Sequence, residues 1–112
     1  MIDMNDKLLS FLGLCRRAGK LVIGAEVTAE SLKTGRSKLV IYAEDFSRGS
    51  LKKVLEAAEG SGTEALCLNR SKEQLSAALG RLSGVLSVED EGFAKKLRAM
   101  ISNEQRGEFD EI

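Results

Sequence analysis

Histidine is the most informative absence in this chain, since it does not occur once in 112 residues. Catalytic triads and dyads that use histidine as the base, and zinc sites with histidine ligands, are therefore excluded. The two cysteines, Cys15 and Cys67, are too few for a four-thiolate site. Both lie among apolar neighbours, which is typical of buried small hydrophobes. Walker and dinucleotide-type glycine loops are also missing, and we expect neither a metal site nor a cofactor.

Proline is absent too, and aromatic residues make up only 4% of the chain. These values argue against proline-rich docking segments and against an aromatic platform that stacks bases. No apolar run approaches the roughly 18 residues that a membrane span needs. The first residues are acidic and lack the basic start of a signal peptide. The expected compartment is the cytoplasm, with no membrane partner.

The formal net charge is zero, but the charges are unevenly distributed. Residues 7–38 contain seven bases and two acids, whereas residues 104–112 contain four acids and one base. A basic segment with an acidic tail fits an anionic partner, and it equally fits ordinary solvated helices.

Apolar periodicity alternates between helix and strand along the whole chain. It predicts helices over about 3–18, 25–34 and 90–103, a helix capped by Ser47 or Ser50, and a short helix capped by Ser71. The predicted apolar face of the helix after Ser47 consists of Leu51, Val54, Leu55 and Ala58. Strands are predicted at 21–23, 38–43, 65–68 and 85–88. We expect one domain over 1–103, a frayed acidic tail over 104–112, and a three-layer α/β/α sandwich whose crossovers favour a mostly parallel sheet.

Two kinds of site are compatible with this arrangement. Acids follow the predicted strands, so a small enzyme that uses Asp45 or Asp90 is one alternative, although acids before helices also serve as caps. The other candidate is the start of helix 25–34, where free N–H groups can receive a phosphate or a base edge. Lys20 and Lys33 lie close to this helix in sequence.

Several segments together resemble a known family. They are Gly24–Glu30, Gly35, Lys38–Asp45, Asn69–Leu75, Gly80 and Gly92–Leu97. From about Lys7 to Ile101, the chain resembles the kink-turn-binding ribosomal proteins of the archaeal L7Ae type, and most of all their small bacterial YlxQ-like relatives. The resemblance implies an α/β/α sandwich with a mixed four-stranded sheet, in which one strand is antiparallel to the rest. It also implies a non-enzymatic RNA-binding protein of the ribosome or translation, with structured RNA (a kink-turn or rRNA) as partner and no DNA.

In that family, the start of the helix corresponding to 25–34 has the pattern Gly-x-Asn-Glu-x-x-Lys, which contacts sheared guanine–adenine pairs. Here Gly24 and Ala25 precede Glu26 at the Asn position, Val27 at the Glu position and Glu30 at the Lys position. The resemblance implies a second RNA contact at the loop Arg81, Leu82, Ser83, Gly84 and Val85, with Lys72 nearby. For Leu82, a core position before a strand is the ordinary alternative.

The substitutions in the helix motif leave two hypotheses for function. Glu26 can replace the missing guanine acceptor, because a carboxylate accepts hydrogen bonds from guanine N–H groups. Alternatively, Val27, Glu30 and the acidic tail indicate a protein-interaction module on the same fold that has lost kink-turn binding.

Overall fold

The computed structural model describes residues 6–106, which form four strands and five helices. The strands are β1 Leu21–Ile23, β2 Leu39–Ala43, β3 Ala65–Leu68 and β4 Val85–Val88, and the helices are α1 Lys7–Arg17, α2 Ala25–Lys33, α3 Arg48–Ser61, α4 Lys72–Leu79 and α5 Glu91–Arg106. Each strand lies at its predicted place. Ser47 caps α3, and a reciprocal pair of hydrogen bonds between Ser71 and Gln74 caps α4.

The sheet has the order β1-β4-β2-β3 and is mixed. β2 and β3 are parallel, whereas β4 is antiparallel to both β1 and β2. The mixed sheet is therefore confirmed, and the mostly parallel sheet inferred from strand–helix alternation is wrong. The reason is that α4 is not a crossover to the far end of the sheet. Lys72, the first residue of α4, lies against Gly84, the residue before β4. β4 therefore starts at the end of the sheet where β2 and β3 finish.

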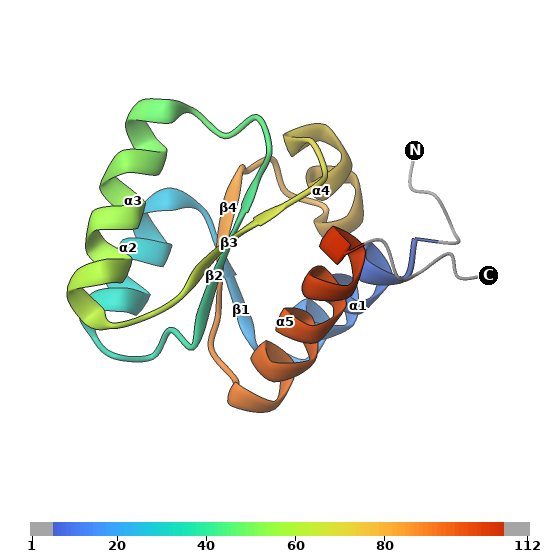
Figure 1. Cartoon of the computed structure of the whole chain (residues 1–112), viewed down its shortest axis with the longest axis horizontal. Helices are drawn as coiled ribbons and strands as arrows, with labels where there is room; N and C mark the ends of the chain where they lie inside the picture. Colours follow the sequence, from blue (N-terminus) through green and yellow to red (C-terminus); the bar gives the residue numbers. More distant parts are fainter. Residues whose placement is uncertain (1–5, 107–112) are drawn as a thin grey trace.

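Two helical layers cover the sheet (Figure 1). On one face α1, α4 and α5 pack over a core that includes Leu12, Leu68 and Leu97. On the other face α2 and α3 lie side by side over a smaller core around Val40 and Val85. All residues of β4 are buried because both layers cover it. This arrangement is the predicted α/β/α sandwich.

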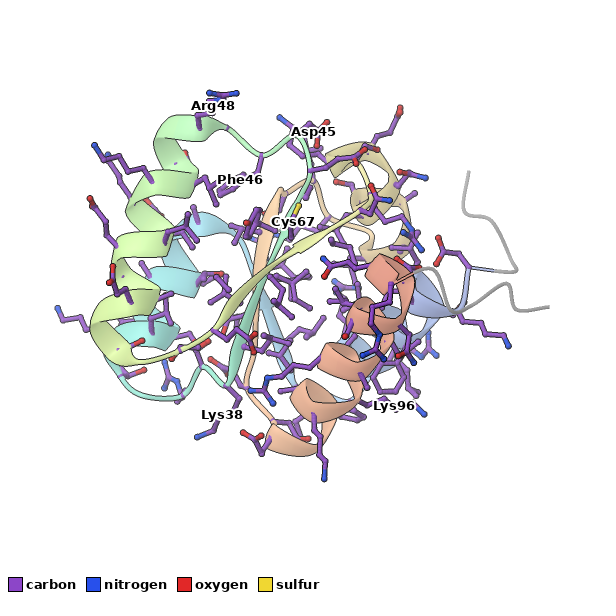
Figure 2. The ribbon with its side chains drawn as sticks, viewed as in Figure 1. Lys38, Asp45, Phe46, Arg48, Cys67 and Lys96 are labelled. Carbon is purple, nitrogen blue, oxygen red and sulfur yellow. The ribbon has the colours of Figure 1, made fainter. Side chains whose placement is uncertain are left out.

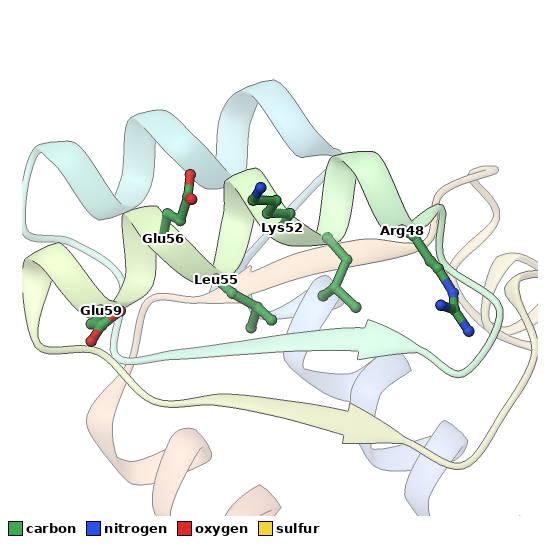
Figure 3. Close-up of a pocket in the computed structure, with 6 residues that line it drawn as sticks. Arg48, Lys52, Leu55, Glu56 and Glu59 are labelled. Carbon is green, nitrogen blue, oxygen red and sulfur yellow. The ribbon is translucent and has the colours of Figure 1, made fainter.

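α3 departs from its predicted apolar face. Val54 and Ala58 pack into the core, but Leu51 is half-buried and Leu55 is 39% exposed. Both leucines line an open groove of about 520 Å³ along the outer side of the helix (Figure 3). Only a narrow row of apolar residues on α3 faces the sheet, because α2 packs against one side of this helix.

One ionic cluster joins both ends of the described chain. The Arg70 guanidinium donates to the Asp6 carboxylate over 2.8 Å and to the Glu104 carboxylate over 2.6 Å. Burial opposes ionisation of Asp6, but the hydrogen bonds from Arg70 and from the Leu9 N–H outweigh it and hold the pKa of this carboxyl below its usual value. Glu104 lies within α5, so that helix continues to Arg106, past its predicted end near 103.

The remainder of the predicted acidic tail, 107–112, lies outside the described residues, as does the predicted start of the first helix near residue 3. Within 6–106, no helix combines the length and apolar character needed to cross a membrane.

A buried chain of serine hydroxyls connects α2 to the sheet. Ser87 of β4 bonds to Ser31 of α2 over 2.8 Å and to Ser37 over 2.7 Å. Ser31 also donates to the Glu89 carboxylate over 2.6 Å. These bonds satisfy polar groups that would otherwise be costly to bury.

Candidate nucleic-acid interface

The candidate surface begins at the turn between β1 and α2. Gly24 has a φ of +124°, which a residue with a Cβ adopts only under strain. Its N–H donates to the Val85 carbonyl oxygen over 2.9 Å, so the turn is tied to the start of β4. Among residues 6–106, no side chain caps α2. The N–H groups of its first turn therefore lack an intrahelical acceptor and face outward as donors.

The exposed face of α2 contains the residues that the sequence singled out. Ala25, Glu26, Val27 and Glu30 are all exposed, and Val27 retains 41% of its accessible surface. A valine this exposed in the first turn of a helix is available to contact a ligand, and the two glutamates give the same face a negative character.

The loop between α4 and β4 lies beside this turn. Gly80 ends α4 in the left-handed conformation, and Ser83 then shapes the loop. The Ser83 N–H donates to the Ser76 hydroxyl over 3.2 Å, while the Ser83 hydroxyl donates to the Val85 carbonyl over 3.0 Å. Leu82 at the tip is 82% exposed, so the alternative that it is a core residue is wrong. The loop presents an apolar side chain held on a fixed backbone.

Gly84 lies where this loop meets the ends of β2 and β3. Its carbonyl accepts from the Ala43 N–H over 2.8 Å. A Cβ at Gly84 would lie 2.6 Å from Phe46 Cδ1 and 3.1 Å from Lys72 Cδ, so only glycine fits without a shift. The Lys72 N–H donates to Asp45 over 2.8 Å. The predicted Lys72 and loop 81–85 are thus in contact, at the end of the sheet where Figure 2 labels Asp45 and Phe46.

Two predicted residues lie elsewhere. The Lys20 carbonyl accepts from the Glu89 N–H, at the opposite end of the sheet from Gly24. Lys33 is in the last turn of α2, about 12 Å along the helix from Ala25. Lys38, labelled at the lower end of Figure 2, marks the same side of the molecule. Closeness in sequence to the start of α2 therefore does not bring Lys20 and Lys33 to the candidate surface, because a strand and a helix each extend away from it.

The acids at the strand ends have local partners. Asp45 accepts from the Lys72 N–H and Asp90 from the Phe93 N–H, so each supports the start of a helix. They lie at opposite ends of the sheet and do not form a pair. Among residues 6–106, no cluster of three acidic or thiol side chains could hold a metal ion.

The thiols are poorly suited to chemistry at neutral pH. Burial raises the pKa of Cys15 to about 11 and raises the pKa of Cys67 above its ordinary value. Both therefore stay protonated, and a thiol is a far weaker nucleophile than a thiolate.

Known proteins are similar to this chain in sequence and in architecture. A family described as "Ribosomal protein L7Ae/L30e/S12e/Gadd45 family" matches residues 6–98. The chain belongs to this family. It is 33% identical to "RNA-binding protein YlxQ" of Enterococcus faecium over 87% of this chain and 93% of that protein. Its identity to the protein of the same name from Bacillus subtilis is 34%, over 80% of this chain and 90% of that one.

Solved structures share the fold of this chain. A Bacillus halodurans protein of unknown function superposes with a TM-score of 0.80 at 32% identity, over 86% of this chain and 97% of its own. A Giardia lamblia 15.5 kD RNA-binding protein has a TM-score of 0.67 at 20% identity, over 91% of each chain, and therefore shares the fold.

One part of the surface was absent from the sequence prediction. Arg16 and Arg17, in the last turn of α1, line an open groove with Val27 and Arg81. In the sequence, Arg16 and Arg17 lie near the end of a predicted helix, where positive charges interact favourably with the helix dipole. Their positions therefore needed no ligand to explain them. Their place beside α2 depends on how α1 packs on the sheet. The useful signal was the excess of bases over residues 7–38.

Proposed function

We propose that this protein is a non-enzymatic RNA-binding protein of the ribosome or of translation, and that it acts in the cytoplasm. It recognises structured, kink-turn-like RNA through the start of α2 and the loop 81–85. The observation that carries the proposal is the contact between these two segments, through the 2.9 Å hydrogen bond from Gly24 to Val85. The names of the Enterococcus and Bacillus relatives support RNA as the partner.

Each segment supplies a different kind of contact. The uncapped first turn of α2 offers N–H donors to RNA acceptors, and Glu26 accepts from guanine N–H groups. Leu82 packs on an unstacked base, and Lys72 and Arg81 neutralise phosphates. Val27 replaces the glutamate of the family pattern, and Glu30 replaces its lysine. RNA binding therefore depends more on the loop 81–85 than it does in relatives that keep the full motif.

The decisive experiment is a titration with a labelled kink-turn RNA at about 150 mM salt. The control RNA is the same duplex with Watson–Crick pairs in place of the tandem guanine–adenine pairs. Binding that is tight for the kink-turn alone supports the proposal. Equal weak binding to both RNAs contradicts kink-turn recognition, and stoichiometric capture of a protein after nuclease treatment would favour the interaction module instead.

The contribution of the loop is tested with Leu82→Ala. Burying this leucine against a base is worth about 1.5–3 kcal/mol, so the variant should bind the kink-turn roughly tenfold to a hundredfold more weakly. The matched control is Leu55→Ala, which shortens an exposed leucine on α3. Equal affinities of the two variants would remove Leu82 from the interface.

The α2 contribution is tested by restoring the family pattern with Glu26→Asn, Val27→Glu and Glu30→Lys together. A bidentate base contact is worth about 1–3 kcal/mol, so affinity for the kink-turn should rise by about fivefold or more, with little change for the control duplex. An unchanged affinity would mean that the RNA does not meet this face of α2.

A further inference from the structure

The groove beside β1 offers a site that the family pattern does not include. It has a volume of about 380 Å³ and lies between the last turn of α1, strand β1 and the first turn of α2. Its lining includes Leu21, Val22 and Ile23 of β1 together with Val27. Three arginines line it, namely Arg16, Arg17 and Arg81. Three cations beside apolar residues suit a ligand with anionic groups and apolar faces.

These arginines differ from those that hold the fold together. Arg70 and Arg98 each bind two carboxylates, and Arg36 faces Glu89. Within residues 6–106, by contrast, no carboxylate pairs with any of the three arginines in the groove. A guanidinium without a carboxylate partner keeps its full set of donors for an external anion, and its planar fork matches phosphate oxygens.

The groove is continuous with the surface assigned above to RNA. Val27 belongs both to the first turn of α2 and to the groove, and Arg81 precedes Leu82 in the loop. Arg16 reaches toward the same loop, since its Nη1 lies 3.8 Å from the position of a Cβ on Gly80. An RNA strand whose bases contact α2 and Leu82 would therefore cross the three arginines where it extends beyond the loop 81–85.

We propose that this groove binds the phosphate backbone of one RNA strand, with Arg16 and Arg17 on successive phosphates and the ribose faces against Val27 and strand β1. This inference rests on the proposed function and extends its surface onto α1 and the edge of the sheet. An acidic protein segment is the competing occupant, but it would not need the adjoining loop.

The test compares salt dependences of RNA binding. Arg16→Gln with Arg17→Gln removes two phosphate contacts and should lower the slope of log affinity against log salt by about 1.4–1.8. If the variant and the wild-type protein bind RNA equally at 1 M salt, this difference in slope predicts that the variant binds about 10–30-fold more weakly at 150 mM salt. The double Lys variant, Arg16→Lys with Arg17→Lys, keeps the charges and should recover most of the slope. Circular dichroism confirms that each variant is folded.

The matched control removes the same charge from α3, whose residues do not line this groove. Arg48→Gln with Lys52→Gln alters the groove along α3 and should leave the slope unchanged. If both Gln pairs lower the slope equally, total charge explains the effect and the groove is not a site. If the Arg16 and Arg17 variant keeps the slope while the wild-type protein binds the kink-turn, the groove proposal is wrong and the proposed function stands. If the wild-type protein binds no RNA, or if a polyglutamate peptide shows the arginine dependence instead, the groove does not hold RNA.

Discussion

Replacing Arg70 with methionine tests the ionic cluster that joins the N-cap of α1, the connection between β3 and α4, and α5. The guanidinium makes two hydrogen bonds to Asp6, two to Glu104 and one to the Asn69 carbonyl. The side chains of Arg70 and Asp6 are only 14% and 11% exposed, so the carboxylate of Asp6 would lose its main partner in a largely dry site. Removing one partner of a fully buried pair costs about 3–5 kcal/mol. Because Glu104 is half-buried and can rehydrate, we expect Arg70→Met to lower the free energy of unfolding by about 2–4 kcal/mol.

The assay is urea unfolding followed by circular dichroism at pH 7. The matched control is Arg98→Met, because Arg98 also bridges two carboxylates, Glu64 and Glu91, but both of these are exposed. Exposed ion pairs contribute about 0–1 kcal/mol, so this variant should remain close to the wild-type protein. Equal losses for the two arginines would refute the argument from burial.

The effect of Arg70→Met should also depend on pH. Since the pKa of Asp6 is held below its ordinary value of 3.8 in the folded protein, its ionised form stabilises the fold fully above that value. The stabilisation is lost as the pH falls through the lowered pKa. The difference between wild type and Arg70→Met should therefore be constant near neutral pH and shrink below about pH 4. A difference that persists unchanged in stronger acid would contradict this account.

Three further substitutions test the packing around the interface, each by urea unfolding. Gly84→Ala places a Cβ 2.6 Å from Phe46 and should cost about 1–3 kcal/mol, whereas Gly49→Ala in open space should cost nothing; equal effects would contradict the close contact. Thr28→Val removes a buried hydroxyl that has no partner among the described residues, so stability should rise by about 1–2 kcal/mol, and a clear loss would show that the hydroxyl is satisfied. Ser87→Ala removes two buried hydrogen bonds and should lower stability by about 1–3 kcal/mol; no loss would show that the serine chain is not stabilising.

Much of the fold could be predicted because its signals are local. Leu39–Ala43 is apolar without alternation and forms β2, one of the two inner strands. Ser71 and Gln74, three residues apart, mark the start of α4. The direction of β4, by contrast, has no local signal in the sequence. Nothing within Val85–Val88 distinguishes a strand that runs antiparallel to its neighbours, and here only the family resemblance indicated the mixed sheet.

The candidate site was predictable where neighbouring residues form it. The turn at Gly24 was predicted from a glycine between a strand and a helix, and the exposed loop tip at Leu82 from the family resemblance. Lys20 and Lys33 were assigned by closeness in sequence, which fails when a strand and a helix extend away from the turn. Arg16 and Arg17 were missed because their own helix explained them.

The sequence by itself determined the helices, the strands, their caps and the two-sided burial of the sheet, because each depends on residues a few positions apart. Tertiary structure decided that β4 runs back between β1 and β2, which places the loop 81–85 against Gly24. It also decided that Arg70 meets carboxylates 64 residues before it and 34 residues after it. Contacts at such separations depend on how whole elements pack and on strand register, and the interface exists only once that packing has formed.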